Sequence, residues 1–317
     1  MDVAVVGLGV IGTVHLGVLP TLPDVSVAFV VDPRPHVAGP LDVERFRSLA
    51  DALAVGRRPD LVVLATPTDT HLDLAAEALA GSDGLVLSEK PLTRDAARLR
   101  QLESEQRAHL GRLRVVNHFA FSPEVEWAVE TVHRHGWGPP QQVVASFADP
   151  YGLKTPAQRT SYVSPWVDSG SNQLSLLSRL CRGWVVRDHE VHPSGLRSVT
   201  RLDFDGGRAT LTATWATGAS SKQTWLRWSD GVEVQLDHTA MTGAVLEDGT
   251  VTEHLGHDGT VERKTAHYTA MYRALLAGTD EDLLGLALAR EVAELLDAAD
   301  AAARRPGDVR WTVRRLG

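Results

Sequence analysis

The first hundred or so residues alternate short apolar runs with segments of helical spacing. Runs that are apolar almost throughout are typical of parallel strands covered on both faces. Such runs lie at Val3–Val6, Val25–Val31, Leu61–Ala65, Leu85–Ser88 and Leu113–Val116. Apolar residues at helical spacing between them predict helices at Ile11–Leu19, Arg45–Leu53, Leu72–Ala80 and Arg94–Leu110. This βαβα order predicts an α/β domain with a doubly wound parallel sheet.

After Asn117 the pattern changes to strands separated by glycine-rich turns. Within Ala209–Trp215, threonines alternate with Leu211, Ala213 and Trp215, which is the period of a strand with one packed face. Further strands are expected at Val143–Phe147, Ser198–Phe204, Gln223–Trp228 and Val232–Leu236. Helices are expected at Pro123–His133, Asp168–Leu180, His267–Ala277 and Leu284–Ala302. This second part is therefore predicted to be α+β, with an antiparallel sheet packed on one face.

The length of 317 residues exceeds the roughly 250 to 300 at which one core stops growing, so two packed domains are expected. Because no repeat or low-complexity linker separates the two patterns, we expect a tight hinge and domains of residues 1–118 and 119–317. Hydrophobic residues make up 43% and charged residues 23%, close to the averages of folded soluble proteins.

Net charge and cysteine content narrow the classes of partner. A net charge of −8 and a pI of 5.9 provide no basic surface for nucleic acid. The single cysteine, Cys181, cannot form an intramolecular disulfide, and the opening MDVAVVG has no basic signal region, so a cytoplasmic location is expected. The longest apolar stretch, Leu283–Ala303, is interrupted by Arg290, Glu291, Glu294 and Asp297, which argues against a membrane span.

The segment Gly7–Gly12, GLGVIG, directly follows a predicted strand and begins a predicted helix. Its glycines suit a tight turn, close approach of a pyrophosphate, and close packing of helix on strand. Asp32 lies twenty residues after Gly12, at the end of the second strand, where a carboxylate accepts hydrogen bonds from an adenosine ribose. The N-terminal domain is therefore predicted to be a dinucleotide-binding Rossmann domain. Asp32 would repel a 2′-phosphate and favours NAD, whereas Arg34 could pair with that phosphate and favours NADP.

Two further segments follow strands at the edge where doubly wound sheets bind ligands. In Ala65–His71, His71 is either catalytic or a structural partner for loop backbone. In Ser88–Pro91, Lys90 either forms a surface salt bridge with Glu89 or is a partly desolvated proton donor. The chain has only four lysines and two asparagines, so each of these residues is a candidate for a specific role. The predicted cofactor contacts are Gly7, Gly9, Val10, Ile11, Gly12, Asp32, Arg34, Thr66, Pro67, His71, Glu89 and Lys90.

The GLGVIG turn, the ATPTDTH segment and the EKP segment, together with the predicted second domain, resemble the glucose-fructose oxidoreductase, inositol dehydrogenase and rhizopine-catabolism (Gfo/Idh/MocA) family. The resemblance covers nearly the whole chain, and it implies an open, mainly antiparallel second sheet. It implies that Lys90 is the acid/base or substrate-binding residue beside the nicotinamide, and that the Lys90–Pro91 peptide is cis. It also implies that the protein is a homodimer or homotetramer, with the open sheet in the interface.

The family's second catalytic segment, an aspartate followed four residues later by a histidine, matches Asp168 and Asn172. A spacing of four places both on one helical face. Asparagine can hydrogen-bond a hydroxyl or carbonyl but carries no proton, so Lys90 becomes the main candidate for proton transfer. The family's arginines before the aromatic-x-Pro segment are replaced by Phe119 and Ala120, which makes an anionic substrate group less expected.

Other proton donors remain open: His118, Tyr151 and Tyr162. Trp166 could stack on a sugar, with core packing as the alternative.

No histidine, cysteine or acidic cluster has zinc-ligand spacing, and no GxSxG nucleophile segment occurs, so neither a metal nor a nucleophile is expected. Cys181 is expected in the core.

These observations predict an NAD(P)-dependent oxidoreductase. Hydride would move between the nicotinamide and a sugar, cyclitol or related carbonyl, hydroxyl or imine substrate, with Lys90 exchanging the proton and Asp168 orienting it. The alternative is a catalytically inactive dinucleotide-binding regulator of the same fold. Loss of the histidine favours that alternative, whereas retention of Lys90 with Asp168 favours the enzyme.

Overall fold

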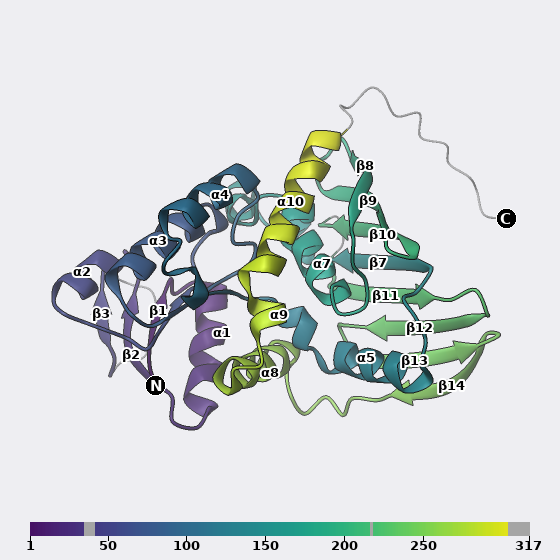
Figure 1. Cartoon of the computed structure of the whole chain (residues 1–317), viewed down its shortest axis with the longest axis horizontal. Helices are drawn as coiled ribbons and strands as arrows, with labels where there is room; N and C mark the ends of the chain where they lie inside the picture. The colour runs from purple at the N-terminus through teal and green to yellow at the C-terminus, as the bar shows by residue number, and fades with distance from the viewer. Residues whose placement is uncertain (35–41, 216–217, 304–317) are drawn as a thin grey trace.

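Two β-sheets lie at opposite ends of the molecule, with helices between them (Figure 1). The computed structural model describes residues 1–34, 42–215 and 218–303. The first sheet has six parallel strands in the order β3-β2-β1-β4-β5-β6, which is the Rossmann order. Its strands are β1 (Asp2–Val6), β2 (Ser26–Val31), β3 (Glu44–Phe46), β4 (Leu61–Leu64), β5 (Leu85–Ser88) and β6 (Leu113–Val115). Its helices are α1 (Val10–Val18), α2 (Leu49–Ala54), α3 (His71–Gly81) and α4 (Ala96–Glu105). The predicted parallel sheet is confirmed.

One predicted helix of this sheet is wrong in its first half. The stretch Arg45–Leu53 begins in strand β3, which pairs with β2, and α2 begins only at Leu49. The Ser48 side chain starts α2 by accepting a hydrogen bond from the Asp51 amide at 3.1 Å. Pairing at the sheet edge, with the Phe46 ring 5.4 Å from the Phe29 ring, overrides the helical spacing. The predicted helix Arg94–Leu110 is also shorter, because α4 ends at Glu105.

The second sheet has eight strands in the order β14-β13-β12-β11-β7-β10-β9-β8. Only β7 and β10 run parallel, so the sheet is mainly antiparallel as predicted. The strands are β7 (Gln142–Ala148), β8 (Val185–Val191), β9 (Arg197–Phe204), β10 (Gly207–Thr214), β11 (Ser221–Arg227), β12 (Val232–Asp237), β13 (Thr242–Glu247) and β14 (Thr250–Leu255). The sequence pattern identified five of them and missed β8, β13 and β14.

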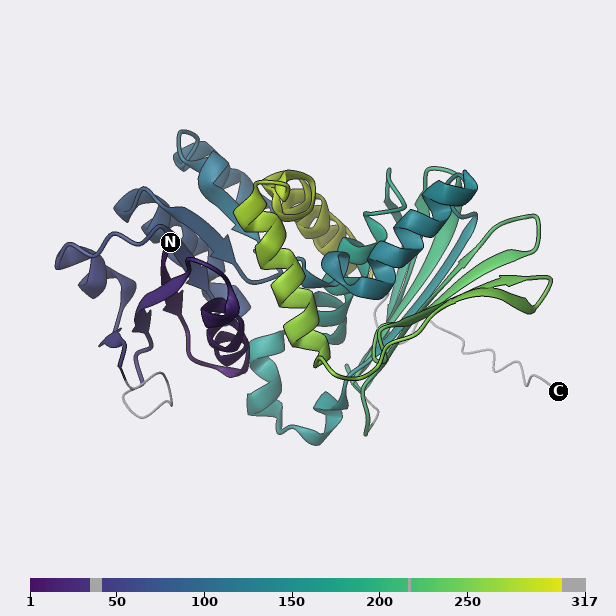
Figure 2. The ribbon, with the colours of Figure 1, turned by 90° about the horizontal axis from the view of Figure 1, so that it is seen from below.

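Helices cover one face of the second sheet and leave the other open (Figure 2). The covering helices are α5 (Pro123–His135), α7 (Ser171–Leu177) and α10 (Leu286–Ala302). Along β10, the side chains facing the helices are buried, and Thr210, Thr212 and Thr214 face the other way, half-buried. The alternation predicted for this strand is confirmed.

Two C-terminal helices also pack on the first sheet. Tyr268 and Met271 of α8 (Arg263–Ala277) pack among the buried side chains of the first sheet. Helix α10 contributes to both sheets, because Ala293 packs against the first sheet and Val292 against the second. Residue 118, the expected domain boundary, begins the 3-10 turn η4 (His118–Phe121). The boundary itself stays a prediction, because the chain after it contributes to both cores.

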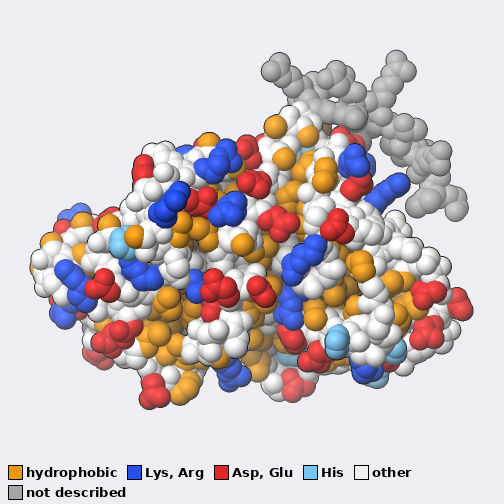
Figure 3. Space-filling model, viewed as in Figure 1, with side chains coloured by type: hydrophobic (Ala, Val, Ile, Leu, Met, Phe, Trp, Pro, Cys, Tyr) orange, Lys and Arg blue, Asp and Glu red, His pale blue; other side chains and the backbone are white. Residues whose placement is uncertain are grey.

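Charges of both signs are interspersed on the face seen in Figure 3, which shows no concentration of lysine and arginine. Within the described residues, no helix is both long and apolar enough to cross a lipid bilayer.

Candidate active site

The glycine-rich turn between β1 and α1 is shaped as a phosphate-binding turn. Gly7 has a φ of +92°, and a Cβ there would lie 2.6 Å from the Ala65 carbonyl oxygen. A Cβ on Gly12 would lie 1.9 Å from the Gly7 carbonyl oxygen, whereas a Cβ on Gly9 would meet nothing within 4 Å. Gly9 therefore leaves open space before the first amides of α1, which have no acceptor within the helix. This turn fits the pyrophosphate of a dinucleotide.

Asp32 lies after β2 and is fixed by four hydrogen bonds. It accepts one from the Leu8 amide at 2.9 Å, one from the Arg34 amide, and two from the Arg34 guanidinium at 2.8 and 2.9 Å. The Arg34 side chain lowers the pKa of Asp32 to about 2, so this carboxylate is ionised near neutral pH. Arg34 is 62% exposed and is paired with Asp32, so the predicted ribose contact and the predicted partner of a 2′-phosphate lie side by side.

The loops after β4 and β5 are joined through His71. Its ring is buried and lies between two carbonyl oxygens, with Nδ1 2.9 Å from Pro91 and Nε2 2.8 Å from Thr66. Burial lowers the pKa of His71 below its ordinary value. These contacts match the structural alternative for His71, which links the two loops that border the cavity.

Glu89 ties the end of β5 to two helices. Its Oε1 accepts a hydrogen bond from Tyr268 Oη of α8 at 2.6 Å and lies 3.1 Å from His15 Nε2 of α1. Burial raises the pKa of Glu89, but the contacts with His15 and Tyr268 outweigh it, so the pKa lies below its usual value. Glu89 therefore pairs away from Lys90, and the surface salt bridge considered for that lysine does not form.

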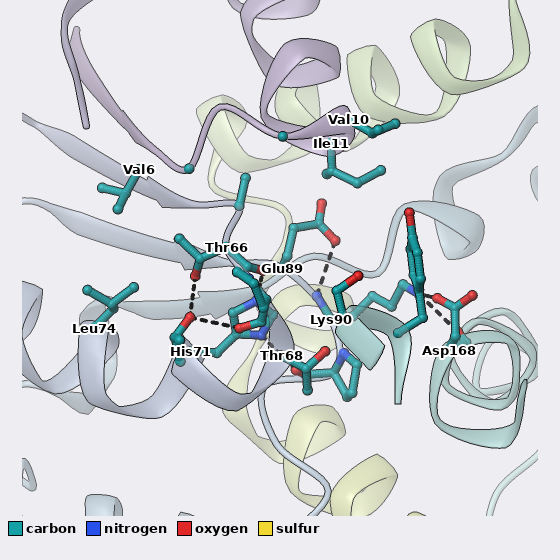
Figure 4. A pocket seen from close by; sticks show the side chains of 18 of the residues that line it. Val6, Val10, Ile11, Thr66, Thr68, His71, Leu74, Glu89, Lys90 and Asp168 are labelled. Carbon is teal, nitrogen blue, oxygen red and sulfur yellow. Dashed lines mark hydrogen bonds and ion pairs between the residues drawn. The ribbon is translucent and has the colours of Figure 1, made fainter. Parts of the chain in front are cut away.

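Lys90 extends from the end of β5 across to the second domain (Figure 4). Its Nζ donates to Asp168 Oδ1 and to the Asp168 carbonyl oxygen, both at 2.9 Å. The two side chains are 11% and 14% exposed. The Lys90–Pro91 peptide is cis, as the family resemblance implies. An ammonium group has three donors, so this geometry leaves one for a substrate oxygen.

Asp168 lies in a π-helical turn, Trp166–Gly170, where a regular α-helix was predicted from Asp168 to Leu180. The α-helix α7 begins at Ser171 and ends at Leu177. A wider turn is a frequent feature of functional sites, and here it places the Asp168 carbonyl within reach of Lys90. Asn172 is buried, and its Oδ1 has no hydrogen-bond partner among the described residues. That oxygen can accept a hydrogen bond from a substrate hydroxyl.

One cavity of about 920 Å³ joins the predicted cofactor contacts to the predicted catalytic residues. Lys90, Asp168 and Asn172 line it together with every predicted cofactor residue except Gly12, which packs beneath Gly7. The cavity lies between the carboxyl ends of the first sheet's strands and the second domain, where doubly wound sheets bind ligands. The structure thus brings Gly7 and Asn172, which are 165 positions apart in the sequence, to the same cavity.

The three alternative proton donors also line this cavity. Burial lowers the pKa of His118 well below its ordinary value and raises the pKa of Tyr151 and Tyr162. All three groups are therefore neutral near pH 7, and the tyrosines can donate hydrogen bonds without ionising. Trp166 is only 1% exposed and packs in the core, so stacking on a sugar is wrong for this residue.

Four charged lining residues after position 118 were not predicted as site residues: Asp149, Lys222, Arg263 and Lys264. Lys222 Nζ lies 2.6 Å from Asp149 Oδ1, and Asp149 in turn accepts a hydrogen bond from Ser169, next to Asp168. The rarity of lysine was the available signal, because three of the four lysines line this cavity.

Other chemistries find little support elsewhere in the structure. Cys181 is buried in the core, and burial raises its pKa to about 12, which disfavours the thiolate. Among the described residues, no three histidine, cysteine or acidic side chains are grouped to hold a metal ion.

Comparison with known proteins gives a family match for the N-terminal part of the chain. Residues 1–115 match the family model GFO_IDH_MocA, described as an oxidoreductase family with an NAD-binding Rossmann fold. No curated protein matches the chain.

Solved structures share the fold over nearly the whole chain. GenD2 from gentamicin A biosynthesis, in complex with NAD, is 24% identical with a TM-score of 0.76, over 95% of this chain and 93% of GenD2. A myo-inositol dehydrogenase from Corynebacterium glutamicum is 18% identical with a TM-score of 0.76, over 96% of each chain. KijD10, a 3-ketoreductase from Actinomadura kijaniata in complex with NADP and TDP-benzene, is 18% identical with a TM-score of 0.75, over 96% of this chain and 98% of KijD10.

Proposed function

We propose that the protein is an NAD-dependent dehydrogenase or reductase of a sugar-like substrate. The match of residues 1–115 to the model of an oxidoreductase family with an NAD-binding Rossmann fold supports this proposal. The observation that carries the proposal is the Lys90–Asp168 pair, which spans both domains inside the cavity. When bound, the nicotinamide exchanges hydride with a carbon of the substrate.

The chain's own residues have separate parts in this reaction. The Gly7–Gly12 turn and Asp32 hold the two ends of the adenosine diphosphate, and Asp32 favours NAD over NADP. Lys90 uses its third donor to bind the substrate oxygen and exchanges a proton with it. Asp168 keeps Lys90 in place with two contacts of 2.9 Å, which makes it a positioning residue.

The substrate is proposed to be a sugar, a cyclitol or a related compound that carries a hydroxyl or carbonyl group. Two features of the cavity support this class. The free Oδ1 of Asn172 can accept from a hydroxyl, and neutral Tyr151 and Tyr162 can donate to ring oxygens. Among the structural neighbours, one is named as a myo-inositol dehydrogenase and one as a 3-ketoreductase, which is consistent with this class.

An inactive regulator would not need a lysine held at the strand end against a carboxylate of the other domain. The test is an NADH and NAD⁺ turnover screen across keto-sugars and cyclitols, with dinucleotide binding measured in parallel by fluorescence. We expect dinucleotide binding and turnover with at least one substrate. Tight dinucleotide binding without turnover across the panel would favour the regulator instead.

A further inference from the structure

Two cations lie over two adjacent aromatic rings, and one of these rings, Phe119, lines the cavity. The buried rings of Phe119 and Phe147 have centroids 5.2 Å apart. Lys222 Nζ, from β11, lies 5.2 Å from the centre of the Phe147 ring. The guanidinium carbon of Arg263, from the first turn of α8, lies 5.4 Å from the centre of the Phe119 ring. Both cations line the cavity, so segments far apart in the sequence direct positive charge to one place.

The charges at this end do not balance. Lys90 pairs with Asp168 and Lys222 pairs with Asp149, but Arg263 has no ion pair within the described ranges. Lys222 is only 3% exposed, and apart from Asp149 its ammonium has no hydrogen-bond partner among the described residues. Buried or half-buried cations with unused donors are costly unless a ligand supplies the acceptors.

We propose that Arg263 and Lys222 form a subsite for an oxyanion of the substrate, a phosphoryl or carboxylate group, held beside the Phe119 ring that lines the cavity. This inference rests on the proposed function and narrows its substrate class. A guanidinium presents a planar pair of donors that matches both oxyanions, and a buried ammonium adds a third donor. The position of Phe119 had made an anionic group less expected from the sequence, yet α8 supplies the arginine that this segment lacks.

The cofactor's pyrophosphate is expected at a different part of the cavity lining, the Gly7–Gly12 turn. The Gly7–Gly12 turn adjoins the core of the first sheet, which includes Leu8, whereas Phe119 and Phe147 belong to the core of the second sheet. Lys264, beside Arg263, interacts electrostatically with three carboxylates, those of Glu262, Glu89 and Asp149, and is left out of the subsite.

The test is calorimetric titration of the NADH-saturated protein with inorganic phosphate and, separately, with acetate. We expect the wild type to bind one of them, and the preferred anion distinguishes a phosphoryl from a carboxylate ligand. Arg263→Gln should weaken that binding roughly ten- to hundredfold, the usual loss for a hydrogen bond to a charged group. Arg273→Gln, at an exposed position of the same helix, is the matched control and should leave binding unchanged.

NADH affinity provides the second readout. Arg263→Gln should bind NADH as the wild type does, and if this variant fails to fold, Arg263→Lys should still show a partial loss of anion binding. The inference is overturned if neither anion binds to the NADH-loaded wild type, or if Arg263→Gln and Arg273→Gln bind it equally. It is also overturned if Arg263→Gln loses NADH affinity as strongly as anion affinity, because the arginine then serves the cofactor. A wild type that does not bind NADH would instead refute the proposed function.

Discussion

Replacing Lys90 by alanine should remove proton transfer while leaving the cofactor site intact. Lys90 Nζ gives two of its three donors to Asp168 at 2.9 Å, so the third is the one directed to the substrate oxygen. A positioned acid or base contributes roughly 10² to 10⁴ in rate, equivalent to about 2.7 to 5.5 kcal/mol of barrier. We therefore expect kcat of Lys90→Ala to fall by that factor, with NADH affinity nearly unchanged.

The assay is steady-state NADH turnover with a substrate found in the screen, together with an NADH fluorescence titration. Lys90→Arg should restore little activity, because arginine stays protonated and cannot accept a proton. Arg98→Ala is the control, since Arg98 is an exposed cation on α4 paired with Asp73. If Lys90→Ala keeps wild-type kcat, the assigned role is wrong and the proton donor must be sought among His118, Tyr151 and Tyr162.

The remaining predictions concern the cofactor turn and the open sheet. Gly9→Ala should keep the fold and weaken NADH binding. Gly12→Ala should also lower the melting temperature, because its Cβ would lie 1.9 Å from the Gly7 carbonyl oxygen. Equal melting temperatures of the two variants would contradict this. Asp32→Ala should narrow the preference for NADH over NADPH, and tighter NADPH than NADH binding by the wild type would overturn the preference. Arg34 lowers the pKa of Asp32 from 3.8 to about 2, so the ionised Asp32 stabilises the folded protein by roughly 2 kcal/mol. This contribution to the free energy of unfolding is present above pH 4 and is lost as the pH falls toward 2. Urea unfolding of wild type and Asp32→Asn should show a gap in unfolding free energy near neutral pH that shrinks in acid, and a gap that widened in acid would refute the pairing. The open face of the second sheet is proposed to join copies of the chain, and sedimentation as a 34.3 kDa monomer at micromolar concentrations would refute that.

Local signals predicted most of the cofactor side of the site. The Gly7–Gly12 turn and the segments ending in His71 and Lys90 each directly follow a strand, so their place at the sheet edge follows from the strand pattern alone. The pairing of Arg34 with Asp32 was not foreseen, because each had been weighed separately as a contact for the cofactor.

The substrate side depends on contacts between distant segments, which a single sequence does not reveal. Lys222 lies over Phe147 and Arg263 over Phe119, and the two cations are neighbours because β11 and α8 border the same cavity. The edge strand β3 was missed for a similar reason, since pairing with β2 outweighs the helical spacing of its residues. The only signal for the substrate side in the sequence was the scarcity of lysine, because three of the four lysines line the cavity.

Isotope transfer tests the central claim most directly. NADH deuterated at C4 of the nicotinamide, in each of its two stereoisomers, would be incubated with the protein and the oxidised form of a substrate from the screen. The account predicts that one stereoisomer delivers its deuterium to a carbon of the product, as seen by mass spectrometry, and that Lys90→Ala slows this transfer without abolishing NADH binding. Unlabelled product from both stereoisomers, formed by a protein that binds NADH, would contradict the account.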